Sequence, residues 1–293
     1  MYELIQAGEK SWYIKSPANI GVYRMNDEEV CLIDSGNDKD AGRKILKIIT
    51  ERGWRVSCIV NTHSNADHTG GNQFIQGRTG CRVLSTDVEN AVSRHPMLEP
   101  TMLYGGYPYA KLRNKFLMAK PTEKTCGIED GLPAGLSVIK LPGHYFDMIG
   151  IMTDDGICFL ADSIFRREII EKYHIVFIYD VAKFLETLDM IETLEAKLFV
   201  PAHADAAEDV RGLAAANRAK VHEIAELLVG LCREPKTFEK ILKAVFDHYG
   251  LTMDDNQHVL VGSTTKSYLS YLYDNGRVQA EFIDNEMLWS AAQ

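Results

Sequence analysis

The strongest indication of the fold lies in residues 62–71, THSNADHTGG, directly after the apolar run 58–60. Within six positions this stretch holds four potential metal ligands: His63, Asn65, Asp67 and His68. In an extended loop, side chains two positions apart project to the same side, which places His63 and Asn65 together. Imidazole and carboxylate groups bind zinc and similar divalent ions, and a cluster this dense is costly to bury without a cation. The stretch predicts a site for one or two metal ions; a polar surface loop is the alternative.

Three further ligand types each follow a strand-like run. His144 follows 136–141, Asp162 follows 157–160, and His203 follows 197–200. Taken singly, each is more typical of a turn or cap residue. Together, however, the groups favour a shared site, because they follow four successive strands and the ends of such strands can lie at one edge of a sheet. We therefore expect these side chains to meet the loop at 62–71.

These residues resemble the motif of the metallo-β-lactamase-fold superfamily of metallohydrolases, which includes glyoxalase II-like proteins. The resemblance covers about the first 210 residues and implies an α/β fold, an αββα sandwich. It also implies that the first ion takes His63, the residue at 65 and His144, and that the second takes Asp67, His68 and His203, with Asp162 able to bridge. Asp34-Ser35-Gly36 is similar to the structural Asp and Gly near the first hairpin of the family.

One position departs from the family pattern, because Asn65 stands where the loop normally has a second His. An amide oxygen is a weaker and harder ligand than imidazole, so the first site should bind zinc less tightly than the second. Zinc remains the expected metal. Manganese or iron, which tolerate oxygen ligands better, are the alternatives, and one site or both can be filled.

The implied activity is hydrolysis. A bound metal lowers the pKa of water from 15.7 toward about 7 and so supplies hydroxide at neutral pH, with Asp67 as the catalytic residue that orients it. We expect a small ester, thioester or related acyl substrate. A phosphodiesterase or ribonuclease of the same fold and a non-catalytic metal-binding descendant are the alternatives.

Composition and charge narrow the class of protein. The chain has 293 residues, 46% hydrophobic and 25% charged, as expected for a globular protein. Its formal charge of −9 disfavours nucleic acid as a partner. The sequence shows no secretion signal, no membrane-spanning run and no Cys-x-x-Cys pair, so a cytoplasmic location is expected.

Residues 95–124 look like an insertion or lid. Within 109–124 five basic residues face a single acidic one, which reverses the charge of the chain locally. A solvated amphipathic helix is one interpretation. The other is a wall that attracts an anionic small-molecule substrate.

The remaining chain predicts a second, helical part. Helical spacing over 210–231, 237–249 and 256–273, followed by a hairpin over 277–290, is typical of a small winged-helix-like domain. We therefore expect a hydrolase domain at 1–210 and a C-terminal extension at 211–293. From Arg233 onward six basic residues face nine acidic ones, which argues against a nucleic-acid-binding face. Packing, covering the pocket or forming a homodimer are the roles expected for this extension.

Overall fold

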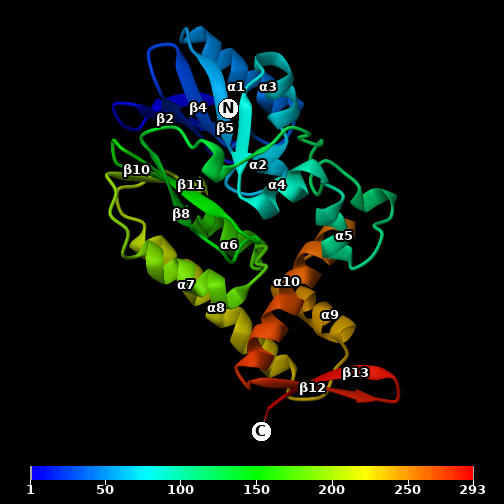
Figure 1. Ribbon diagram of the computed structural model, residues 1–293. Helices are drawn as coiled ribbons and strands as arrows, with labels where there is room; N and C mark the ends of the chain where they lie inside the picture. The colour runs from blue at the N-terminus through cyan, green and yellow to red at the C-terminus, as the bar shows by residue number, and fades with distance from the viewer. Residues whose placement is uncertain (1, 293) are drawn as a thin grey trace.

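A computed structural model describes residues 2–292 and places two sheets face to face (Figure 1). The first sheet has seven strands in chain order, antiparallel from β1 to β4 and parallel from β4 to β7. Its strands are β1 Glu3–Gln6, β2 Ser11–Lys15, β3 Ile20–Arg24, β4 Glu29–Ile33, β5 Arg55–Val60, β6 Arg82–Ser85 and β7 Cys126–Gly127.

The second sheet has the order β11-β10-β9-β8. Its strands are β8 Leu136–Lys140, β9 Ile149–Thr153, β10 Ile157–Phe165 and β11 Leu198–His203. β8, β9 and β10 pair antiparallel, and β10 pairs with β11 in parallel. Parallel pairing puts the C-terminal ends of β10 and β11 at the same edge of the sheet.

Helices cover the outer face of each sheet. The helical elements before β8 are α1 Lys39–Glu51, α2 Ala66–Thr69, α3 Asn72–Thr79, α4 Asp87–Arg94, α5 Leu98–Tyr104 and the 3-10 turns η1 Ala110–Leu112 and η2 Ile128–Asp130. Two more helices, α6 Arg167–Tyr173 and α7 Val181–Ile191, lie between β10 and β11 in the chain. α1 begins at Asp38, whose side chain accepts a hydrogen bond from the Ala41 amide, and it buries Ile45 and Ile49.

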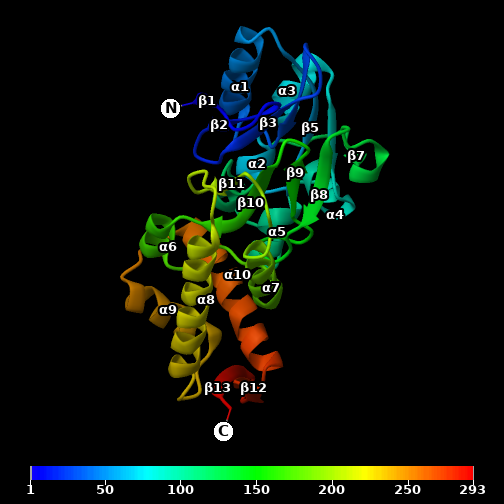
Figure 2. The ribbon, with the colours of Figure 1, turned by 90° about the vertical axis from the view of Figure 1, so that its left-hand side faces the viewer.

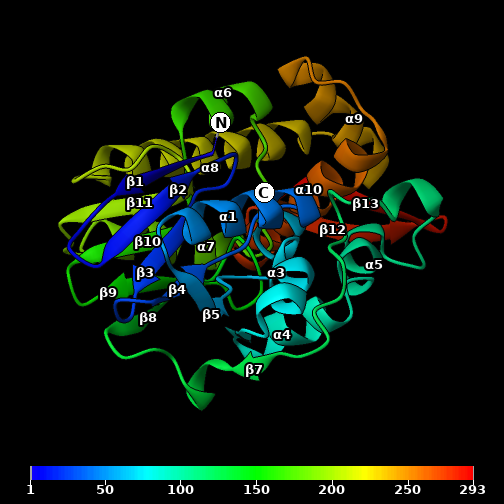
Figure 3. The same cartoon turned by 90° about the horizontal axis from the view of Figure 1, so that it is seen from above.

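Successive side chains of a strand point to opposite faces of the sheet, so the apolar residues of each sheet form two separate core layers. Leu32 and Ile59 of the first sheet pack against Ile45 of α1, whereas Ile33 and Val60 face the second sheet. The outer face of the second sheet packs on α7 and α8. Figure 3 shows these layers from above. The predicted αββα sandwich is confirmed.

The segment 95–124 forms a cap beside α10. It contains α5, η1 and extended chain, so the amphipathic-helix interpretation of its basic part is wrong. The cap is tied down because Tyr109 Oη donates to Asp255 Oδ1 at 2.6 Å and Asn114 Nδ2 donates to Asn256 Oδ1 at 2.9 Å. Leu112 and Val259 belong to a small apolar cluster between the cap and α10.

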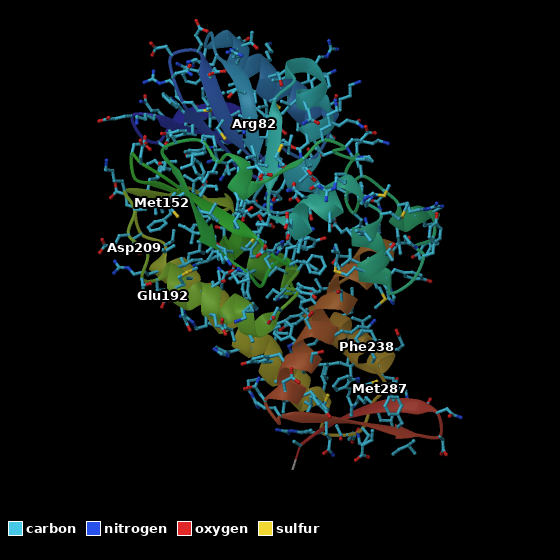
Figure 4. All side chains as sticks on the ribbon, in the orientation of Figure 1. Arg82, Met152, Glu192, Asp209, Phe238 and Met287 are labelled. Atoms are coloured by element: carbon cyan, nitrogen blue, oxygen red, sulfur yellow. The ribbon has the colours of Figure 1, made fainter. Side chains whose placement is uncertain are left out.

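The C-terminal part consists of α8 Arg211–Leu231, α9 Phe238–Tyr249, α10 Asp255–Asp274 and the hairpin β12 Val278–Ile283 with β13 Glu286–Ala291. α8 and α10 extend away from the sheets and lie beside each other (Figure 2). Figure 4 shows Phe238 and Met287 at the end of the molecule remote from Arg82 in the first sheet. One apolar cluster runs from Leu160 of β10 to Tyr268 of α10. The domain boundary at 210 and the winged-helix-like character stay predictions.

Within residues 2–292, no helix combines the length and the hydrophobicity that spanning a lipid bilayer requires.

Candidate metal centre

The loop after β5 is held by close backbone packing. His63 and Asn65 precede α2, and Asp67 and His68 lie in it. A Cβ on Gly70 would lie 2.2 Å from the backbone of Asn37, so only glycine allows the loop to pack this tightly against the residues after β4. The loop is thereby fixed at the edge where β4 and β5 end.

The other predicted ligands come from the second sheet. His144 lies between β8 and β9, Asp162 lies inside β10, and His203 is the last residue of β11. The sequence-based prediction that these last two strands end at Leu160 and Val200 is therefore wrong. Ala161 has φ +50°, and the register between β10 and β11 shifts on both sides of it, so the strand continues past an irregularity that carries Asp162.

Six predicted His and Asp residues come together at this edge as two groups. In each group, one potential ligand atom per residue lies within 4.8 Å of the others. The first ligand group is His63, His144 and Asp162, and the second ligand group is Asp67, His68, Asp162 and His203. Asp162 belongs to both: its Oδ1 lies 3.0 Å from His68 Nε2, and its Oδ2 lies 3.6 Å from His144 Nε2.

Asn65 presents its oxygen to the first ligand group. Its Oδ1 lies 3.1 Å from His144 Nε2, while its Nδ2 donates to Glu99 Oε1 at 2.8 Å. Glu99 is only 5% exposed. Because an oxygen of Glu99 accepts from the amide nitrogen, the amide oxygen is the atom that faces the histidines.

The hydrogen bonds of the histidines show whether this arrangement suits a cation. His144 Nδ1 lies 2.9 Å from the carbonyl oxygen of Phe177, and His203 Nδ1 lies 3.2 Å from that of Pro17. A carbonyl oxygen can only accept, so each Nδ1 donates and leaves its Nε2 lone pair facing inward in the neutral ring.

His68 follows the same rule, since its Nδ1 lies 2.7 Å from Asp34 Oδ2. The buried Nε2 of His63 has no hydrogen-bond partner among the described residues. The buried Nε2 of His68 and Oδ1 of Asp162 lie 3.0 Å apart but form no hydrogen bond while the ring is neutral, because both atoms are then acceptors. Buried acceptors that converge in this way repel one another unless a cation lies between them. The donor set of imidazole and carboxylate fits zinc and similar divalent ions.

The two ligand groups differ electrostatically. Burial lowers the pKa values of His63 and His144 below the ordinary range for imidazole. In the second ligand group burial acts in the same direction on His203, but the carboxylates of Asp162 and Asp67 outweigh it and raise the pKa to about 10. Burial raises the pKa of Asp67, but His68 and His203 outweigh it and hold the pKa below its usual range. The second group therefore attracts positive charge more strongly.

Two supporting residues were missed by the sequence reasoning, Glu89 on α4 and Glu99 on α5. Glu89 is fully buried and accepts hydrogen bonds from the backbone amides of Ser64 and Asp147, both at 2.9 Å. It thereby ties the metal loop to the β8–β9 connection. Helical spacing gave one usable signal, because Glu89 lies three positions before the buried Val92 on α4.

A cavity of about 460 Å³ opens onto the ligand groups. Its apolar lining comes from three parts of the chain: Leu103, Phe116 and Leu117 of the cap, Phe177, and Leu260 of α10. Polar lining includes Asn37, Lys115 and Glu99 as well as the ligands. The C-terminal part thus contributes to the wall of the cavity.

Comparison with curated proteins finds short stretches of similarity. A hydroxyacylglutathione hydrolase of Rhizobium etli is 30% identical over 122 residues, which are 41% of this chain and 39% of the relative. One of Rhodospirillum rubrum is 32% identical over 68 residues, 23% of this chain and 26% of the relative. The alignments thus span well under half the length of these relatives.

Solved structures show the fold over almost the whole chain. A metallo-beta-lactamase family protein of Thermus thermophilus has a TM-score of 0.72 at 19% identity, covering 99% of this chain and 98% of the other. A beta-lactamase domain protein of Burkholderia ambifaria has the same TM-score and identity and covers 99% and 94%.

The family model of the metallo-beta-lactamase superfamily matches residues 14–203. The matched range contains both ligand groups and the two large sheets except β1 and the first three residues of β2. The chain therefore belongs to the metallo-beta-lactamase superfamily.

Proposed function

We propose that the protein is a metal-dependent hydrolase that cleaves a small ester, thioester or related acyl substrate. The observation that carries the proposal is the convergence of imidazole lone pairs on the shared carboxylate of Asp162, at the floor of an open cavity. Membership of a superfamily of hydrolases supports it. The hydroxyacylglutathione hydrolases among the relatives favour a thioester within this class.

Each ligand group would hold one divalent ion, zinc first and manganese or iron as alternatives. Such an ion, when bound, lowers the pKa of water toward neutrality and polarises the oxygen of the substrate. The side chain of Asp67 is 42% exposed whereas that of Asp162 is 5% exposed. Asp67 can therefore reach a water molecule in the cavity and accept its proton in a hydrogen bond, while Asp162 holds the two groups together.

The cavity favours an acyl substrate. Its apolar side chains, Leu103, Phe177 and Leu260 among them, provide a surface for hydrocarbon next to the polar ligand groups. The ester or thioester carbon would then lie over the ligands, with the acyl chain against the apolar wall.

The test is a substrate and metal screen. Protein purified without chelator should contain about one metal ion or more per chain. It should hydrolyse thioesters or lactones faster than bis(p-nitrophenyl) phosphate in the presence of zinc, manganese or iron. Preference for the phosphodiester would refute the acyl assignment, and metal content well below one ion per chain, with no turnover of any substrate, would favour a non-catalytic descendant.

A cytoplasmic location and a homodimer stay predictions. All six cysteines are free thiols in the part of the chain that the structure describes, which fits a reducing compartment.

A further inference from the structure

A second cavity of about 510 Å³ lies beside the catalytic cavity. Both walls include Asn37 and Lys115, so these two residues lie between the cavities. The wall of the second cavity also includes Gly70, two residues after His68. Because the backbone of Asn37 is pressed against Gly70, the second cavity has a fixed position relative to the metal loop.

The second cavity is strongly cationic although the chain carries a net charge of −9. Lys39, Arg78, Lys115 and Lys120 line it, against the single carboxylate of Asp38. That carboxylate is already engaged, since it accepts from the Ala41 amide at 2.9 Å and pairs with Lys115 at 3.2 Å. Among the ion pairs of residues 2–292, none includes Lys39, Arg78 or Lys120, so three cations lack a neutralising partner.

Two of these cations lie near the same aromatic ring. Lys39 Nζ lies 5.9 Å and Arg78 Cζ lies 5.6 Å from the centre of the Phe74 ring. Phe74 also lines the cavity. Cations held at a ring face lose part of their side-chain freedom before a ligand arrives, which reduces the entropic cost of binding an anion there.

We propose that the second cavity binds phosphate groups on the thiol part of the substrate, which is the leaving group. The enzyme would then act on thioesters whose thiol component carries phosphate groups at a distance from the sulfur. This inference rests on the proposed hydrolase function. The acyl group would lie among the apolar residues of the catalytic cavity, and the thiol part would pass Asn37 and Lys115 into the second cavity. The basic segment 109–124 supplies Lys115 and Lys120 to this wall, as its anion-attracting interpretation predicts.

The charge of the cavity favours phosphate over carboxylate. A phosphate monoester carries about −1.5 to −2 at pH 7, and Arg binds phosphate oxygens through two parallel hydrogen bonds. The two carboxylates of a glutathionyl group are partly offset by its ammonium, so that group would leave more of the cationic charge unmatched.

The reaction balances without a further reactant. The oxygen of water forms a bond to the acyl carbon, the C–S bond breaks, and its electron pair stays on sulfur. One proton from the water ends on the thiol and the other is released with the carboxylate product. The second cavity takes no part in these bond changes and acts through binding alone, so its residues are specificity-determining and not catalytic.

The experiment compares a double variant, Arg78→Ala with Lys120→Ala, against a matched control, Arg233→Ala with Lys240→Ala, which removes two exposed cations in the C-terminal part. Three butanoyl thioesters are assayed: those of coenzyme A, of glutathione and of the neutral N-acetylcysteamine. For the coenzyme A thioester, the double variant should raise KM about tenfold or more with little change in kcat, as expected when charge-assisted contacts that bind substrate and transition state equally are lost. The neutral thioester and the control should not change.

Each other outcome decides a separate point. Equal loss for all three thioesters, or no loss, would overturn the inference while leaving the hydrolase intact. If only the glutathione thioester were bound less well by the double variant, the inference of a phosphate site would be overturned in favour of a carboxylate site. If the protein hydrolyses esters or lactones but no thioester, the inference is overturned while the proposed function stands. If it hydrolyses no acyl substrate, the proposed function fails, and calorimetry with adenosine 3′,5′-bisphosphate against S-methylglutathione then tests the cavity by itself. Binding of the bisphosphate that the double variant loses would support the phosphate site, and no binding would overturn it.

Discussion

The two ligand groups share one carboxylate and differ in nearly everything else. The second ligand group has two carboxylates and two histidines that attract positive charge, whereas the first has two histidines with lowered pKa values and the oxygen of Asn65. Charge therefore favours a cation in the second group. The first group depends more on geometry, and Glu99 supplies part of that geometry by holding the amide.

The contrast between the groups shows that the replacement of a histidine by Asn65 is supported by its surroundings. An isolated amide in a buried site could turn either end toward the ligands. The hydrogen bond from Nδ2 to Glu99 fixes the oxygen toward His144, so an oxygen atom of a harder kind is available to the first group as a potential ligand. Substitutions in each group can remove or reduce this contrast.

The largest effect is expected from Asp162→Ala, because this carboxylate belongs to both groups. Metal content measured by inductively coupled plasma mass spectrometry should fall at both sites. Turnover should fall by at least about 100-fold, since changes to residues that only support metal ligands already cost roughly 10–100-fold. Circular dichroism is the control for folding. A variant that keeps two ions per chain would show that Asp162 is not shared between them.

Asp67→Ala separates the groups from each other. Asp67 lies only in the second ligand group, so the first should keep its ion while turnover falls by about 100-fold or more. Folding should change little, because the side chain is 42% exposed. His144→Ala is the matched variant for the first group and should remove the other ion. Full turnover of Asp67→Ala would refute its orienting role.

The sequence pointed to the side chains that converge better than to those that support them. Histidines and an aspartate after successive strands are visible as a pattern, and the parallel ends of β10 and β11 bring two of them together as expected. Glu99 was hidden because it lies in a segment with the composition of an exposed lid, and charged residues are rarely fully buried. Its burial follows from the packing of the cap on α10, a contact between residues far apart in sequence that no local pattern encodes.

Glu99 is a positioning residue for the first ligand group, and two substitutions test this. Glu99→Ala removes the acceptor for Asn65 Nδ2 and should weaken metal binding at the first group by about tenfold, the lower end of the range for supporting residues. Glu99→Gln keeps a carbonyl oxygen that can accept the same hydrogen bond and should restore most of the affinity. Isothermal titration of the demetallated protein measures both. Equal losses in the two variants would show that the hydrogen bond to Asn65 does not explain the effect of Glu99.

The smallest effect is expected from Asn65→His, which replaces the amide oxygen near the first ligand group by an imidazole nitrogen. Imidazole is a better ligand for zinc than an amide oxygen, so zinc occupancy at the first group should rise, by about severalfold in competition with manganese. The second group should not change, because it does not include residue 65. In the Glu99→Ala background the same substitution should recover zinc binding. The amide of Asn65 needs Glu99 to turn its oxygen toward the site, whereas an imidazole at this position does not need that hydrogen bond to present a nitrogen ligand. An unchanged ratio of zinc to protein in both backgrounds would mean that Asn65 does not contact the metal.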